Sequence, residues 1–280
     1  MFKLILCLTT AFIIYAASYA NEASMVTLPS IAWQGKAIVI YLPKWHGQVI
    51  SGKFLGQTFK IYDNQINFIG IIGVPIDAQI GSQPIYISYM EYGITKEAIY
   101  NIPVAKTKFA AARFYLPSQK NKLRSRKIID NEWPQIERAL LKESDERLWN
   151  GKFVLPANGP ISMAFGQREI INGAAAGSHR GVDLAVVSGS KVFVPNNGTV
   201  VFVKKLKAFG NTIVIDHGHG LFTLYFHLSN SLVKVGQTIP KGQIIALSGN
   251  SGISSGPHLH WGMSVHNLRV DPMQWVNNEM

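Results

Sequence analysis

Residues 256–265 read GPHLHWGMSV and place two histidines, His258 and His260, at the start of an apolar run. Side chains alternate between the two faces of a β-strand, so both imidazoles project onto the same face of a sheet. Two buried imidazoles are costly to desolvate unless they share a partner. The stretch therefore predicts a strand whose histidines meet other polar side chains.

Two further segments supply such partners, because seven of the eight histidines lie in the second half of the chain. In HRGVD (179–183), His179 and Asp183 are four residues apart, a spacing that puts both side chains on one face of a helix or a strand. The glycine and the apolar residues that follow His179 favour a loop that enters a strand. His227 lies in LYFHL (224–228), on another predicted strand.

A single histidine on an apolar strand is most simply a structural core residue. The pairs His179 with Asp183 and His258 with His260 favour a shared polar site instead. Four imidazoles and one carboxylate can converge across a sheet. Zinc binds neutral imidazole and carboxylate, and a catalytic zinc site uses three protein ligands with a fourth position for water. Two histidines and one aspartate fit this pattern and leave two histidines for proton transfer.

Composition narrows the class of protein. The chain has 280 residues, of which 47% are hydrophobic and 15% charged, which is too apolar for a disordered chain and long enough for two domains. The single cysteine, Cys7, excludes an intramolecular disulfide framework and a Cys-x-x-Cys zinc ribbon. The net charge of +11 favours anionic partners. Because no nucleic-acid-binding motif is present, we expect anionic envelope polymers and no nucleic acid.

Residues 1–20 have the features of a secretory signal peptide. Lys3 precedes an uncharged stretch that closes with Ser-Tyr-Ala, a small-x-small cleavage pattern. We therefore expect a protein of the periplasm or cell envelope, with an uncleaved N-terminal anchor as the alternative.

The remainder divides into three parts. Over 21–105, short β-branched and aromatic runs recur at about ten-residue spacing, which predicts a β-sandwich-like domain. Within 106–150, eight basic residues and no acid occur between Lys106 and Lys127, typical of a solvated linker or an exposed edge strand. Residues 130–149 then predict one amphipathic connector helix with Pro134 in its first turn. Over 151–280 we expect an antiparallel β domain without a helix, so that the protein is mostly β.

Taken together, the motifs resemble the zinc endopeptidases of the LytM/lysostaphin type, peptidase family M23, which cut peptide bonds in peptidoglycan. The resemblance runs from Phe153 to Pro272 and includes HRGVD (179–183), YFHL (225–228) and GPHLH (256–260). The upstream β domain and connector are similar, more loosely, to those of Gram-negative envelope members.

The resemblance implies roles for individual residues. The family's zinc ligands fall on His179, Asp183 and His260, and its two non-ligand catalytic histidines fall on His227 and His258. One of these two would remove a proton from the attacking water, and the other would help to stabilise the oxyanion. The implied substrates are peptidoglycan stem peptides with a D-Ala-diaminopimelate crosslink, and glycine bridges are the alternative.

The chain also departs from the family pattern. Lysostaphin-like members have a tyrosine shortly before the first ligand, whereas 172–178 contains none, and whether Asn172 completes the metal sphere of a latent form stays open. His217 and His219 are expected to be structural residues of an exposed turn, and His266 a surface residue. Residues 249–256 are expected to form a mobile loop at the cleft.

Two other functions compete with catalysis. A non-catalytic family member would bind cell wall or activate another hydrolase, but such proteins typically lose zinc ligands. Residues 235–244 also resemble a lipoyl or biotinyl carrier, although no modifiable lysine lies at a hairpin tip.

The residues ahead of the catalytic unit suggest that the N-terminal domain or the basic linker positions or occludes the cleft. Nothing in the sequence specifies an oligomeric state.

Overall fold

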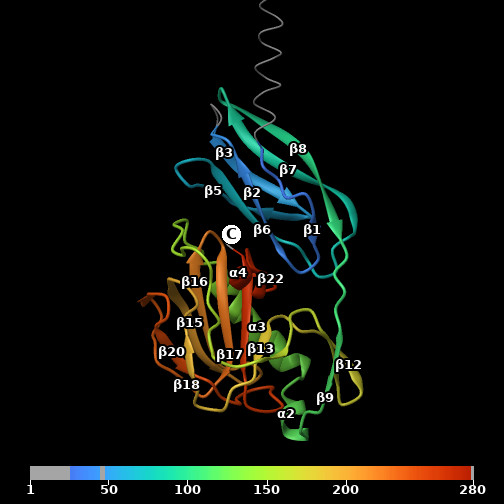
Figure 1. The fold of residues 1–280 in the computed structure, drawn as a ribbon, viewed down its shortest axis with the longest axis vertical. Coiled ribbons are helices and arrows are strands. Elements are labelled where there is room, and N and C mark those ends of the chain that lie inside the picture. Colours follow the sequence, from blue (N-terminus) through green and yellow to red (C-terminus); the bar gives the residue numbers. More distant parts are fainter. Residues whose placement is uncertain (1–25, 45–47, 279–280) are drawn as a thin grey trace, which may run out of the picture.

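The computed structural model describes residues 26–44 and 48–278, and this part of the chain is mostly β-strand, which confirms the predicted fold class (Figure 1). The expected signal peptide, Cys7 and His46 lie outside the described residues. Within the described ranges, no helix is long and apolar enough to cross a membrane.

Two sheets form the N-terminal part. The five-stranded sheet has the order β1 (Ala32–Trp33), β8 (Ile94–Ala105), β7 (Gly81–Glu91), β3 (Gln48–Phe54), β4 (Gln57–Phe59). The three-stranded sheet has the order β2 (Ala37–Leu42), β6 (Phe68–Gly73), β5 (Ile61–Asp63). Buried isoleucines of β2 and β7 share one core, because alternate residues of each strand face inward.

The C-terminal part is built on an eight-stranded sheet. Its order is β10 (Ile161–Met163), β13 (Val182–Leu184), β21 (Leu259–Val265), β17 (Leu221–Leu228), β16 (Gly210–Gly218), β15 (Gly198–Leu206), β19 (Thr238–Ile239), with β22 (Leu268–Val270) also paired to β21. Two three-stranded sheets accompany it, with the orders β12 (Ala174–Ser178), β11 (Arg168–Ile171), β9 (Ala111–Phe114) and β14 (Lys191–Phe193), β20 (Ile244–Leu247), β18 (Asn230–Ser231).

Strand β17 is buried along its whole length because both of its faces are covered. Tyr225 and Leu228 belong to the main C-terminal core, whereas Leu224 and Phe226 belong to a second cluster with Ile136. Ile136 lies on helix α3 (Arg126–Leu140), so this helix packs directly behind the strand that carries His227.

The connector is therefore part of the C-terminal fold. From β8 the chain runs along one side of the molecule to β9 and helix α2 (Ser118–Lys122) at its far end, and α3 leads back (Figure 1). Strand β9 pairs in parallel with β11, as an edge strand of that sheet.

The predicted bounds of the connector helix, 130–149, are wrong. The helix begins at Arg126 and ends at Leu140, which leaves Pro134 in its interior. Beyond Leu140 the backbone bonds to the strands instead: Ser144 N donates to Asp216 and Leu148 N to the carbonyl of His217. These tertiary hydrogen bonds replace the helical ones.

The expectation of a C-terminal half without helices is also wrong, because α4 (Met273–Asn277) is a short helix. The Asp271 carboxylate accepts a hydrogen bond from Met273 N at 2.9 Å, and Trp275 is buried against Trp149 and Phe153. Such a five-residue helix is too short to show an apolar period in sequence.

The two parts of the molecule are joined where β2 and β6 meet β22 and α4. Lys36 pairs with Asp271, and the Gln274 side chain bonds to both backbone groups of Ala37. Ala37 and Ile71 are members of the C-terminal core cluster. The N-terminal sheets are thus packed against the end of the sheet that carries His260.

Candidate metal centre

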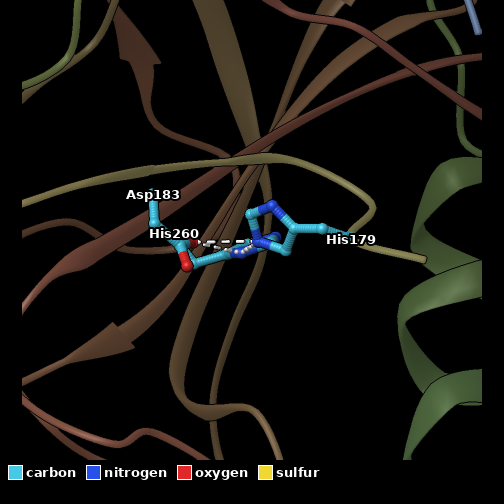
Figure 2. A group of neighbouring side chains, drawn as sticks. All are labelled: His179, Asp183 and His260. Carbon is cyan, nitrogen blue, oxygen red and sulfur yellow. Dashed lines mark hydrogen bonds and ion pairs between the residues drawn. The ribbon is translucent and has the colours of Figure 1, made fainter. Parts of the chain in front are cut away.

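Three polar side chains meet at one point: His179, Asp183 and His260 (Figure 2). Nε2 of His179 lies 3.0 Å from Oδ1 of Asp183 and 3.0 Å from Nδ1 of His260, and the latter two atoms are 2.8 Å apart. Two imidazole nitrogens and a carboxylate oxygen are donors of the kind that zinc binds. The structure therefore brings the three expected ligands together.

The strand pairing explains why the group forms. Asp183 on β13 and His260 on β21 are direct cross-strand partners, and partners in a sheet share a face. His179 arrives from the turn before β13. A Cβ atom at Gly181 would lie 2.6 Å from Nε2 of His260, so only glycine allows this turn to approach the strand.

Neighbouring groups orient the rings. Nδ1 of His179 lies 3.1 Å from the carbonyl oxygen of Ala164. A carbonyl can only accept, so Nδ1 carries the proton and Nε2 directs a lone pair at the group. The Phe226 ring stacks on His260 with a centroid separation of 5.1 Å and an interplanar angle of 6°.

The pKa shifts of Asp183 and His260 favour the protonation states in which these side chains bind a metal ion. Burial opposes a charge on Asp183, but hydrogen bonds with His179 and His260 hold its pKa well below the usual value. Burial lowers the pKa of His260 to about 4, although Asp183 is adjacent. For His179 burial acts in the same direction, but bonding to Asp183 outweighs it and the pKa is raised. A charged carboxylate beside neutral His260 is the state in which these side chains bind metal.

His227 and His258 lie beside this group, with ring centroids 5.0 Å apart. Nδ1 of His227 is 2.8 Å from the carbonyl of Ser251, and Nδ1 of His258 is 2.9 Å from the carbonyl of Gly256. In the neutral form of each ring, Nδ1 therefore carries the proton and Nε2 is the acceptor. Nε2 of His258 lies 3.7 Å from Oδ2 of Asp183. Burial, with the nearby His258 and His260, lowers the pKa of His227 to about 3.

The five residues line a cleft of about 990 Å³, and the connector forms part of its wall. All residues of β9 border the cleft, together with Arg124, Ile129 and Trp133. The loop 249–256 also contributes to the lining and supplies the carbonyl oxygens that hold His227 and His258. The segment expected as a solvated linker or edge strand thus includes an edge strand that borders the cleft.

The other histidines of the described residues, His217, His219 and His266, are not members of the metal group. His217 is fully buried, with Nδ1 2.6 Å from the carbonyl of Asn197 and Nε2 2.8 Å from Oγ1 of Thr223. His219 is also buried, so the expected exposed turn is wrong. His266 is not a surface residue: it bonds to the Glu143 carboxylate at 3.0 Å because the segment after α3 folds over its turn.

The side chain of Asn172 points to the connector. Its Oδ1 accepts a hydrogen bond from Leu116 N, and its Nδ2 donates to the carbonyl of Leu116. These two bonds use the amide group, and Asn172 is not a member of the metal group.

Sequence reasoning missed three residues of this region. Lys120 donates to the loop carbonyls, Ser254 contacts His258, and Arg269 borders the cleft as a buried cation. Lys120 and Arg269 lie far in sequence from the residues they approach, so no local spacing could have indicated them.

Two imidazoles and a carboxylate gathered by antiparallel strands, with spare imidazoles alongside, are typical of metal-dependent hydrolases. Comparison with known families makes the class specific: residues 177–272 match the peptidase family M23. The match lies in the C-terminal part of the chain and confirms the resemblance seen in the sequence.

Similar proteins support the same family. An uncharacterized metalloprotease of Haemophilus influenzae is 47% identical over 96 residues, which cover 34% of this chain and 20% of that protein. The peptidoglycan DD-endopeptidase ShyA of Vibrio cholerae is 43% identical over 96 residues, covering 34% of this chain and 22% of that protein. The alignments thus span about a fifth of these relatives.

One solved structure shares the fold over most of the chain. A putative peptidase M23 from Pseudomonas aeruginosa superposes with a TM-score of 0.66 and 23% identity, covering 88% of this chain and 94% of that one. The arrangement of the N-terminal sheets, connector and C-terminal sheets is therefore similar in that protein.

Proposed function

We propose that the chain is an exported zinc metalloendopeptidase that hydrolyses peptide crosslinks of peptidoglycan. The observation that carries this proposal is the convergence of His179, Asp183 and His260 within 3.0 Å of one another, beside His227 and His258 in one cleft. The peptidoglycan DD-endopeptidase activity named for the Vibrio cholerae relative supports the substrate class.

His179, Asp183 and His260 would hold the zinc ion. The donor set fits, because each residue directs a nitrogen lone pair or a carboxylate oxygen into the same space. When bound, zinc supplies Lewis-acid polarisation of a carbonyl and lowers the pKa of a water molecule.

His227 and His258 would move the protons. Each donates its Nδ1 proton to a loop carbonyl, so Nε2 is the nitrogen that would take a proton from the attacking water. Once one of them is protonated, its positive charge would lie beside the developing oxyanion. The same imidazolium could then give its proton to the leaving amine. One histidine would thus act first as a base and then as an acid, and the other would help to stabilise the oxyanion.

The main alternative is a non-catalytic M23-like protein that binds cell wall or activates another hydrolase. Such a protein has no need of a complete donor set or of two further histidines with free Nε2 atoms. Both features are present here, and they favour catalysis.

We also propose the organisation inferred from the sequence: a signal peptide at 1–20, an N-terminal β domain at 21–105, a connector at 106–150 and a catalytic domain at 151–280. Export by this signal would place the protein in the periplasm or cell envelope. The position of β9 and Trp133 along the cleft supports a connector that positions the substrate-binding wall.

Digestion of purified sacculi of known chemistry tests the function. The zinc-loaded chain is expected to convert crosslinked muropeptides to monomers, as read by mass analysis. His258→Ala serves as the inactive control and Arg126→Gln, an exposed change on α3, as the active one. Persistence of the crosslinked species with the wild-type chain would contradict the proposal.

A further inference from the structure

Arg269 is a buried cation on β22 that borders the cleft and is only 6% exposed. Its Nη2 donates a hydrogen bond of 2.6 Å to the carbonyl oxygen of Arg180, the residue that follows His179. Its Nε has no hydrogen-bond partner. Among the residues described, no carboxylate forms an ion pair with Arg269.

The fold makes room for this guanidinium. A Cβ atom at Gly262 would lie 1.7 Å from Nη2 of Arg269, so the strand beneath it must carry a glycine. The rings of Trp133 and Phe226 lie 6.0 and 5.8 Å from its Cζ atom. Aromatic rings stabilise a cation but do not neutralise its charge.

Buried arginines are normally paired with a carboxylate or a phosphate, because an unpaired buried charge is costly. Here burial, together with the charge of Arg180, lowers the pKa of Arg269 to about 9. Arg180 is exposed and lines the same cleft. Two acids line this cleft, Asp183 and Glu169, and Asp183 is already bonded to two imidazoles. Among the residues described, neither acid forms an ion pair with Arg180 or Arg269.

We infer that Arg269, together with Arg180, binds a free carboxylate of the substrate peptide. This inference rests on the proposed function and adds a specificity site to it. Because Arg180 is adjacent to His179, a carboxylate held here lies close to the amide that is to be cleaved. A guanidinium is the side chain best suited to bind a carboxylate through paired hydrogen bonds.

The inference separates the two crosslinks that the sequence left open. In a D-Ala-diaminopimelate crosslink, the carbon that carries the scissile amide nitrogen also carries a free carboxylate. A glycine bridge has no carboxylate at that place. Recognition by Arg269 therefore selects the diaminopimelate crosslink.

The test uses two crosslinked peptides that differ in one group, a free carboxylate or a carboxamide next to the scissile amide. With the zinc-loaded full chain, kcat/KM is expected to be at least about tenfold higher for the carboxylate, the scale of a charge-assisted hydrogen bond. Arg269→Met is expected to bring this ratio close to one, and Arg269→Lys to leave an intermediate ratio. Arg126→Gln, which removes an exposed cation of α3, is expected to keep the wild-type ratio.

A wild-type ratio near one would overturn the inference. An equal decrease in kcat/KM for both peptides in the Arg269→Met chain would also overturn it. That result would show that Arg269 only holds the carbonyl of Arg180 in place. If Arg269→Met does not give a cooperative melting transition, Arg269→Lys and Arg180→Gln provide the same comparison with the fold retained.

Calorimetric binding of the two peptides to the zinc-free full chain separates this inference from the proposed function. Tighter binding of the carboxylate peptide without hydrolysis by the zinc-loaded chain would contradict only the proposed function. Hydrolysis with equal binding and equal rates for both peptides would contradict only the role of Arg269.

Discussion

Lys120 donates a hydrogen bond of 2.8 Å to the carbonyl oxygen of Gly252 and a second, of 2.7 Å, to that of Asn250. Between these two residues lies Ser251, whose carbonyl accepts the Nδ1 proton of His227. One side chain of the connector thus fixes the loop segment that orients a proposed catalytic histidine.

Lys120→Ala is expected to lower kcat on a crosslinked peptide by about tenfold, because small displacements of a catalytic group are costly. Zinc content should stay unchanged, since the metal group does not contact this loop carbonyl. Lys122→Ala, an exposed change on the same helix, is the matched control and should keep the wild-type rate. Faster hydrolysis by Lys120→Ala would show that the connector occludes the cleft, contrary to the positioning role proposed here.

His227→Ala and His258→Ala are each expected to retain zinc and to lose hydrolysis by about 10²- to 10⁴-fold, the range for removal of a general acid or base. The measurement is kcat together with bound zinc for each variant. Loss of zinc from either variant would move that histidine into the ligand set, and undiminished kcat would remove it from the mechanism.

Acid should destabilise the fold through His217. Burial lowers its native pKa to about 4, whereas the unfolded side chain titrates near 6.5. Between these values the unfolded chain binds a proton that the native chain does not, so the free energy of unfolding falls as the pH is lowered from 6.5 to 4. The shift corresponds to a contribution of about 3 kcal/mol.

Urea unfolding of the wild-type chain and of His217→Asn at several pH values between 7 and 4 measures this contribution. The variant should be less stable at pH 7 and should lose less stability on acidification. Protonation of Asp216 changes the free energy of unfolding in the opposite direction, because burial raises its pKa to about 6. Its contribution cancels in the comparison, because both chains contain Asp216. Parallel pH profiles of the two chains would contradict the assignment to His217.

The strands could be predicted well because their signal is local. Short β-branched and aromatic runs indicated the strands of the N-terminal sheets, and the apolar runs around His227 and His260 indicated β17 and β21. The spacing within HRGVD and HLH likewise suggested which side chains share a face, and cross-strand pairing of Asp183 with His260 brings them together.

What the sequence did not indicate depends on contacts between distant segments. The segment after Leu140 leaves the helix because its amides bond to β16, and the imidazole of His266 is covered because Glu143 folds against it. Lys120 and Arg269 act through backbone carbonyls of other segments, and a carbonyl carries no residue-specific signal in a sequence.

The most direct test of the central claim is the zinc content of the purified full chain and of His260→Ala, measured by elemental analysis beside sacculus digestion. We expect one zinc per wild-type chain with release of crosslinks, and neither bound zinc nor release in the folded variant. A His260→Ala chain that still bound one zinc and still digested sacculi would contradict it.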